Sequence, residues 1–198
     1  GSIPIHAIEQ DLRQIPYVRH AVANIDMDGR LLIRIQQRKA VLRIMDMQGT
    51  GFYVDQEGLK MPVSLNYVPK VPVASGFISE TYGKPLDSMQ SPMVRDLFEI
   101  AGFISRHEFW EHQIVQRYVN AAEEIELIPR AGQQRILFGD ASSMEDKFDR
   151  LMVFYRGIVP KVGMDAYQGV NLKYAGQLVC ERGLGFDTAK MPEVIPAG

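Results

Sequence analysis

Residues 31–53 read LLIRIQQRKAVLRIMDMQGTGFY, and this stretch decides the fold. In its first half, Leu31, Ile33 and Ile35 fall on one face of an extended chain and the residues between them on the other. Such a period of two is typical of β-strands. A second strand-like run covers residues 41–45, and an arginine-rich joint separates the two. The stretch therefore predicts two strands that flank a basic joint.

The residues before this stretch predict a helix and a further strand. Ile5, Ile8, Leu12 and Ile15 recur at helical spacing, with a proline at position 4 suited to the first turn and another at position 16 that ends the pattern. The turn signal at residues 28–29, Asp-Gly, then makes residues 22–27 the first strand of a hairpin.

The residues after the stretch predict a meander of strands with helices between them. Turns are expected at Gly49-Thr50-Gly51 and at Gly58, and four prolines between residues 62 and 85 indicate turns and short edge strands. Helices are predicted at residues 93–104 and 144–155, the second with a capping box of Ser142 and Glu145. The remaining predicted strands cover residues 114–119, 125–128 and 136–138.

Residues 170–181 predict a closing hairpin. Strands at residues 170–174 and 177–181 are separated by Ala175-Gly176, the spacing of a tight two-residue turn. The following residues, 184–198, have little periodicity and are expected to form a flexible tail.

Composition restricts the class of protein. The 198 residues are 46% hydrophobic, enough for a core, and the formal net charge of −2 excludes both an acidic disordered tail and a generally basic nucleic-acid binder. Residues 1–43 hold seven basic and four acidic residues, and the remainder holds 15 and 20. This contrast suits two modules, the first near an anionic membrane surface, although ordinary solvated faces are the better explanation of the charge distribution alone.

The single cysteine, Cys180, excludes an intrachain disulfide, and its place in an apolar alternation predicts a small buried side chain rather than a nucleophile. The sequence has no run of roughly 20 apolar residues of the kind that spans a membrane, and no signal peptide.

The motifs of catalysis and cofactor binding are incomplete, so we expect no catalytic residue, metal or cofactor. Val54 stands where a dinucleotide fingerprint needs its third glycine. His107 and His112 are five residues apart, which on a helix turns them roughly 140° away from each other. Glu123, Glu124 and Glu126 are the candidates for a carboxylate pair that would cleave glycans, but we expect an exposed acidic turn there.

A basic cluster occupies the joint, and it contains no aromatic residues that could stack on bases. We therefore expect no nucleic-acid partner, and leave open a contact with protein or lipid. The cluster consists of Arg34, Arg38, Lys39 and Arg43.

Several motifs together resemble the extracytoplasmic region of the bacterial cell-division family FtsQ/DivIB. The segment IRIQQRKAV at residues 33–41 is similar to the family's joint, with Ala40 where proline is usual. FYVDQEG at residues 52–58 resembles its aromatic-Val-Asp-x-x-Gly turn. Residues 69–76, 135–139, the helix around Lys147 and residues 167–174 continue the match in order, over about residues 5–183.

This resemblance implies an α+β protein with two parts. The first, residues 3–43, would be a truncated POTRA module consisting of a helix and a strand hairpin, without the module's first strand and helix. The second, residues 44–183, would be a β-rich domain with a mainly antiparallel sheet and two or three helices. The resemblance also implies a single membrane-spanning helix before this region, which would lie on the periplasmic side of the inner membrane.

The implied function is that of a non-catalytic divisome scaffold that binds the FtsB–FtsL pair and coordinates septal wall synthesis. A partner segment would add as a strand to the last β-strand. Asn171-Leu172-Lys173-Tyr174 corresponds to the family's Asp-Leu-Arg-Tyr, although a tryptophan that some members carry near Glu181 is missing here. The expected partner-binding residues are Lys173, Tyr174, Gly176, Leu178, Val179 and Glu181.

Two alternatives remain at this point. One is another POTRA-containing module of envelope transport or assembly. The other is a hydrolase of the cell wall, whose signature would be a deep pocket with two converging carboxylates.

Overall fold

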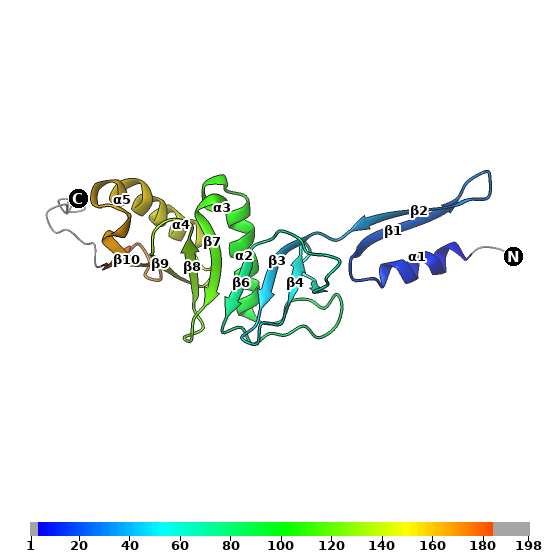
Figure 1. Cartoon of the computed structure of the whole chain (residues 1–198), viewed down its shortest axis with the longest axis horizontal. Coiled ribbons are helices and arrows are strands. Elements are labelled where there is room, and N and C mark those ends of the chain that lie inside the picture. Colours follow the sequence, from blue (N-terminus) through cyan, green and yellow to red (C-terminus); the bar gives the residue numbers. More distant parts are fainter. Residues whose placement is uncertain (1–3, 184–198) are drawn as a thin grey trace.

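The structure, a computed structural model, describes residues 4–183. A helix and a two-stranded hairpin project from one end of a much larger sheet, so the molecule is elongated (Figure 1). The predicted tail, residues 184–198, lies outside the described residues.

The projecting unit contains α1 (Ile5–Arg13), β1 (Val18–Ile25) and β2 (Leu31–Gln37). Helix and hairpin are confirmed, and β1 begins four residues before the predicted strand. The helix packs on β1 because Ala21 and Ala23 are small and fully or almost fully buried. The Glu9 carboxylate also accepts the Ala23 N–H at 2.8 Å, which fixes the helix to the strand.

Strand β2 keeps its apolar face exposed. The side chains of Leu31, Ile33 and Ile35 are 37, 42 and 51% exposed, although they alternate as predicted. The register pairs Ala23 with Ile33, so both residues lie on the face toward α1. The helix covers only the β1 half of that face, and a two-stranded sheet with so little covered area is marginal by itself.

The larger sheet has nine strands in the order β11-β10-β9-β8-β7-β6-β3-β4-β5. Pairs β3–β6, β6–β7 and β9–β10 are parallel, and the other pairs are antiparallel. This confirms an α+β fold with a mostly antiparallel sheet. The strands are β3 (Ala40–Met45), β4 (Gly51–Asp55), β5 (Lys60–Pro62), β6 (Val73–Gly76), β7 (Ile114–Val119), β8 (Ile125–Pro129), β9 (Arg135–Gly139), β10 (Tyr167–Asn171) and β11 (Val179–Arg182).

Helices cover one face of this sheet. They are α2 (Pro92–Ser105), α3 (Glu108–Gln113) and α4 (Met144–Val153), which continues through a π-helical turn at Phe154–Ile158 into α5 (Val159–Val162). A 3-10 turn at Met164–Ala166 then leads into β10.

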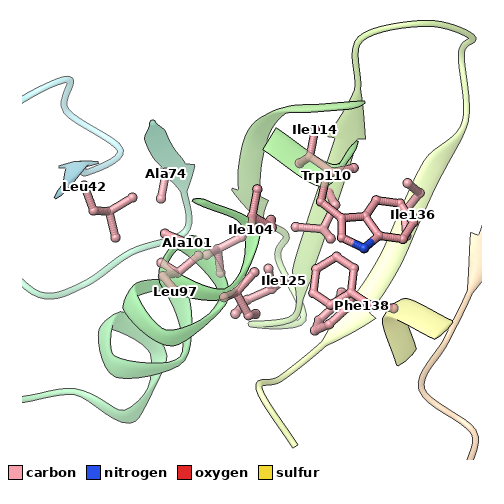
Figure 2. Packing of buried hydrophobic residues seen from close by; sticks show 14 of the residues in the cluster. Leu42, Ala74, Leu97, Ala101, Ile104, Trp110, Ile114, Ile125, Ile136 and Phe138 are labelled. Atoms are coloured by element: carbon pink, nitrogen blue, oxygen red, sulfur yellow. The ribbon is translucent and has the colours of Figure 1, made fainter. Parts of the chain in front are cut away.

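The core lies between these helices and the sheet (Figure 2). The Phe148 ring stacks on Phe103, with 4.5 Å between ring centroids, and also contacts Trp110 and Phe138 at 5.1 and 5.0 Å. Because removing a buried aromatic ring costs about 3–5 kcal/mol, Phe148 fixes α4 against the sheet.

The predicted capping box of Ser142 and Glu145 is wrong. Helix α4 begins at Met144, and its N-cap residue is Ser143, which has a left-handed backbone (φ 48°) and no side-chain capping bond. The Ser142 hydroxyl instead donates to the Asp140 carboxylate. A hydrogen bond from the Ser142 hydroxyl to an ionised carboxylate is stronger than a bond between this hydroxyl and a backbone N–H of the helix. The local Asp–Ser bond therefore forms in place of the cap.

Three turns follow one local rule. In residues 26–30, 46–50 and 55–59, an aspartate carboxylate accepts the backbone N–H groups two and four residues later. The fourth residue of each turn is a glycine with positive φ, a conformation that other residues adopt at a cost. The predicted turns at Gly49 and Gly58 are therefore confirmed, with Asp46 and Asp55 as their organisers.

The joint between hairpin and sheet is held by Arg38. Its Nη1 lies 2.7 Å from a carboxylate oxygen of Asp55 and 2.7 Å from one of Glu57. Its backbone N–H donates to Tyr17, and its carbonyl accepts the Tyr67 hydroxyl, while the Tyr17 and Tyr67 rings pack 5.3 Å apart. Arg38 of the basic cluster is thus a structural residue.

The other members of the basic cluster have separate surroundings. The Arg43 guanidinium lies 5.7 Å from the centre of the Tyr53 ring, and Arg34 and Lys39 are exposed. Residues 40–43, which the sequence prediction placed with the first unit, lie in β3 of the larger sheet.

Candidate functional site

The two outer strands of the nine-stranded sheet have different surroundings. At β5, the backbone of residues 86–88 pairs along the outer edge: Lys60 N–H donates to Asp87, and Leu86 N–H donates to Lys60, at 2.7 and 2.9 Å. Loop residues therefore cover that edge. At the other end, β11 pairs with β10, and among residues 4–183 no further strand lies beyond it.

The register shows which backbone groups of β11 point outward. Leu172 N–H donates to Leu137 on the β9 side, so the neighbouring Asn171 directs its backbone toward β11. Asn171 pairs with Val179, and Gly183 N–H donates to Ala166, so residues 179, 181 and 183 turn inward. Because inward and outward groups alternate along a strand, the N–H and C=O of Cys180 face outward.

The two faces of β11 differ in chemistry. Leu178 and Cys180 are half-buried and pack against the core on the helix side. Burial raises the pKa of the Cys180 thiol to about 11, in agreement with the prediction of a small apolar side chain rather than a nucleophile. Val179, 41% exposed, and Glu181 lie on the opposite, open face of the sheet.

The predicted tight hairpin at Ala175-Gly176 is longer than expected. The strands end at Asn171 and begin again at Val179, so residues 172–178 form a connection. The side chain of Arg150 on α4 donates to the carbonyls of Leu172, Tyr174 and Gln177. These carbonyls are satisfied by a side chain instead of a partner strand, which is why the ladder stops early.

Arg150 is the residue of this region that sequence reasoning missed. Arg150 lies about 25 residues before the connection at residues 172–178, and no local sequence pattern predicts a contact over that distance. A guanidinium can bind several carbonyls at once because its donors form a planar fork. The connection is therefore shaped by α4 as well as by its own turn, in which Gln177 N–H donates to Tyr174.

Lys173 and Tyr174 have different environments. The Lys173 ammonium forms an ion pair with Glu124 on the turn before β8, and this hydrogen bond raises the pKa of Lys173. Tyr174 is 54% exposed, whereas Val170 and Leu172 before it are buried. Gly176 has positive φ in the turn. The six expected binding residues thus lie on one connection and one edge strand, with Tyr174 presented to solvent.

A polar hollow of about 450 Å³ lies on the open face beside this edge. Arg135, Gly169 and Glu181 are directly opposite one another on β9, β10 and β11. Glu126 on β8 pairs with Leu137 and so lies diagonally from Arg135 on the same face, with its carboxylate 2.6 Å from the Arg135 guanidinium and bonded to Asn120 at 2.9 Å. Because Gly169 has no side chain, the row is hollow at its centre.

The glutamates considered for glycan cleavage do not form a pair. Glu123 and Glu124 lie in the predicted turn, Glu124 with Lys173, and Glu126 is almost buried with Arg135. The Nδ1 atom of His107 is bonded to the Phe103 carbonyl of α2, and that of His112 to the Glu108 carbonyl of α3, each at 2.7 Å. Within residues 4–183 no group of three His, Cys, Asp or Glu side chains is arranged to hold a metal ion.

These features define a class of protein: an α+β domain whose large sheet ends in an open strand, with an aromatic connection and a polar hollow beside it. The family model described as "FtsQ/DivIB, C-terminal related" matches residues 39–181. The chain belongs to this family, which is related to the C-terminal domain of FtsQ/DivIB rather than being FtsQ/DivIB itself. No curated protein matches the chain. Among residues 4–183, every helix is too short or too polar to cross a membrane.

Proposed function

We propose that this domain is a non-catalytic scaffold of the bacterial division machinery and that it binds the extracytoplasmic part of the FtsB–FtsL pair. Two observations support the proposal. The family match covers the nine-stranded sheet except for its last residue, and β11 leaves the outward N–H and C=O of Cys180 without a neighbouring strand among the described residues. An edge of this kind pairs readily with an extended segment of another protein.

The proposal gives each expected residue a role. Leu178 and Val179, with Glu181, would flank the added strand on the two faces of the sheet. Tyr174 would contribute exposed aromatic area at small entropic cost, and Gly176 would shape the turn that presents it. Lys173 would contact the partner only if its ammonium bound the partner in addition to Glu124 or broke the ion pair with Glu124.

We also propose that α1 and the β1–β2 hairpin are part of a POTRA-type module, and that the domain lies on the periplasmic side of the inner membrane, attached by a single membrane-spanning helix. A helix followed by two antiparallel strands fits the module, and the exposed face of Leu31, Ile33 and Ile35 would be covered by its other elements.

Titration calorimetry with the extracytoplasmic part of the organism's own FtsB–FtsL pair tests the binding role. Cys180→Pro removes the outward N–H, and proline is tolerated on an edge strand where that group faces solvent. Binding should weaken by at least about tenfold. Cys180→Val is the matched control, because it changes the same side chain, keeps the N–H and should bind like the original chain.

Thermal unfolding must show that both variants remain folded. A folded original chain that does not bind the pair would disprove the scaffold role as drawn here. Equal binding by the proline and valine variants would show that the pair binds elsewhere than at the edge of β11.

A further inference from the structure

The polar hollow beside β11 specifies the chemistry of the strand that the edge would accept. We infer that the bound strand carries a lysine or arginine beside Glu181 on the open face and apolar residues beside Leu178 and Cys180 on the helix side. This inference rests on the proposed strand addition and adds the identity of the partner's side chains.

The residues of an added strand meet the two faces of the sheet in turn. Side chains alternate between the faces, and directly opposite residues have Cβ atoms about 4.5–5.5 Å apart. A strand added to β11 therefore places one set of side chains next to Val179 and Glu181. It places the other set next to Leu178 and Cys180, which border the core.

The Glu181 side chain is turned toward the hollow. A Cβ atom built at Gly169 would lie 2.9 Å from a carboxylate oxygen of Glu181, so this carboxylate leans over the glycine and into the hollow. Arg135, the residue opposite Gly169 on the other side, already lies 2.6 Å from Glu126. The charge of Arg135 is thus shared with a carboxylate that is almost completely buried.

Acidic side chains outnumber basic ones in the hollow. The hollow contains two carboxylates, those of Glu126 and Glu181, and one guanidinium, that of Arg135. The Oε2 atom of Glu126 is buried. It forms the ion pair with Arg135 but accepts no hydrogen bond of good geometry. The hollow therefore has a net negative charge and spare acceptors, and the long side chain of a lysine or arginine at the neighbouring strand position reaches its rim.

The apolar half of the inference follows from the opposite face. Leu178 and Cys180 are half-buried on the border of the core, so a side chain placed beside them extends the core by one strand. Burying apolar area there is favourable, whereas burying a charge would be costly. The preferred strand alternates apolar residues with polar ones, and its basic residue is on the polar side.

Three synthetic peptides test the inference: Thr-Val-Thr-Leu-Xaa-Leu-Thr-Val-Thr, acetylated and amidated, with Lys, Gln or Glu at Xaa. Fluorescence anisotropy with the folded domain should give the tightest binding for Lys, about threefold tighter than Gln, with Glu weakest. Glu181→Lys should reverse the order of the Lys and Glu peptides. Glu111→Lys, an equal charge change on exposed α3, should leave the order unchanged.

The preference should also decrease at high salt, because exposed charges are screened. If the three peptides bind equally well, or if Glu181→Lys leaves their order unchanged, the inference is wrong while strand addition stands. If none of the peptides binds and the FtsB–FtsL pair does not bind either, the proposed function fails and this inference fails with it. If the pair binds while every peptide fails, the edge does not accept an isolated strand and the inference is wrong.

Discussion

At Asp140 one carboxylate organises a turn, a helix start and a buried cation. It accepts from Ser142, and it lies 2.9 Å from the ammonium of Lys147, whose side chain is only 5% exposed. The Ser142 and Lys147 hydrogen bonds lower the pKa of Asp140 to about 2. Asp140 in the β9–α4 connection thus stabilises the start of α4, the helix that carries Arg150.

Asp140→Asn should therefore make stability less dependent on acid pH. A depressed carboxylate pKa contributes stability that is complete above its unfolded pKa of about 4 and is lost as pH falls through about 2. At pH 7 we expect a loss of about 1 kcal/mol, a modest value because Asp140 itself is exposed. Urea unfolding between pH 2 and 7 measures both effects.

Asp149→Asn is the control for this experiment, since Asp149 is an exposed residue of α4, the helix that follows Asp140. Equal pH profiles for the two variants would contradict the role given to Asp140.

Glu123 occupies a turn position that the Asp-x-x-Gly turns give to glycine. Asn120 replaces aspartate as the acceptor, and Glu123 has a φ of 58°. A left-handed backbone costs a non-glycine residue about 1–2 kcal/mol, and a glycine avoids this cost. Part of the resulting stabilisation is lost because glycine has greater conformational freedom in the unfolded chain. Glu123→Gly should stabilise the domain by about 0.5–1 kcal/mol in urea unfolding.

Gly49→Ala is the reciprocal change, because a Cβ at Gly49 meets no atom within 4 Å and the φ is 78°. It should destabilise the domain by about 1 kcal/mol. The rule would be refuted if Glu123→Gly lowered the stability.

At the scale of elements, the strands of the N-terminal hairpin and those in the middle of the large sheet have different support. Strands β7 and β8 are internal, with a neighbouring strand on each side (Figure 1), and their side chains Ile114, Val119, Ile125 and Leu127 are buried. The β1–β2 hairpin has one helix and an exposed apolar face. Local stability follows buried area and flanking strands more closely than it follows strand propensity.

Amide hydrogen exchange should consequently separate the two sheets. Amides in residues 18–37 should open at a free energy several kcal/mol below those of residues 114–129, which require global unfolding. Native-state exchange in low urea, followed by NMR, measures both sets. Identical opening energies would mean that the hairpin and the large sheet unfold as one unit, and would count against a separate N-terminal module.

For the whole molecule, Arg38 decides whether the hairpin and the sheet move together. Its ion pairs with Asp55 and Glu57 connect β2 to β4, and Arg19 adds a second contact to Glu57 at 2.9 Å. Asp55 is buried, so an unpaired carboxylate would be left in the joint if the guanidinium were removed.

Arg38→Met should loosen the joint and cost about 3 kcal/mol, the value typical of a buried ion pair that loses one partner. Rotational correlation times from NMR relaxation should become shorter for residues 18–37 than for the large sheet. Arg34→Met removes an exposed arginine from the same cluster and should change stability by less than about 0.5 kcal/mol. Indistinguishable variants would show that the joint is held by the tyrosines instead.

Local patterns predicted the elements because their causes are local. Alternating apolar residues predicted the strands at 31–37 and 40–45, and apolar residues three and four apart predicted α1 and α2. Glycines that follow an aspartate predicted the turns. The order of motifs also predicted the family relation to the FtsQ/DivIB C-terminal domain, which the family match over residues 39–181 supports.

Side-chain contacts that the apolar patterns do not reveal decided the rest. The Ser142 cap and the two-residue hairpin were wrong because Asp140 and Arg150 bond the groups that local geometry would have paired otherwise. The open edge of β11, the covered edge of β5 and the hollow above Gly169 arise only when strands far apart in the chain lie side by side. Local sequence determines backbone conformation, whereas the choice of neighbour, and with it the surface available to a partner, is made by the packing of the whole sheet.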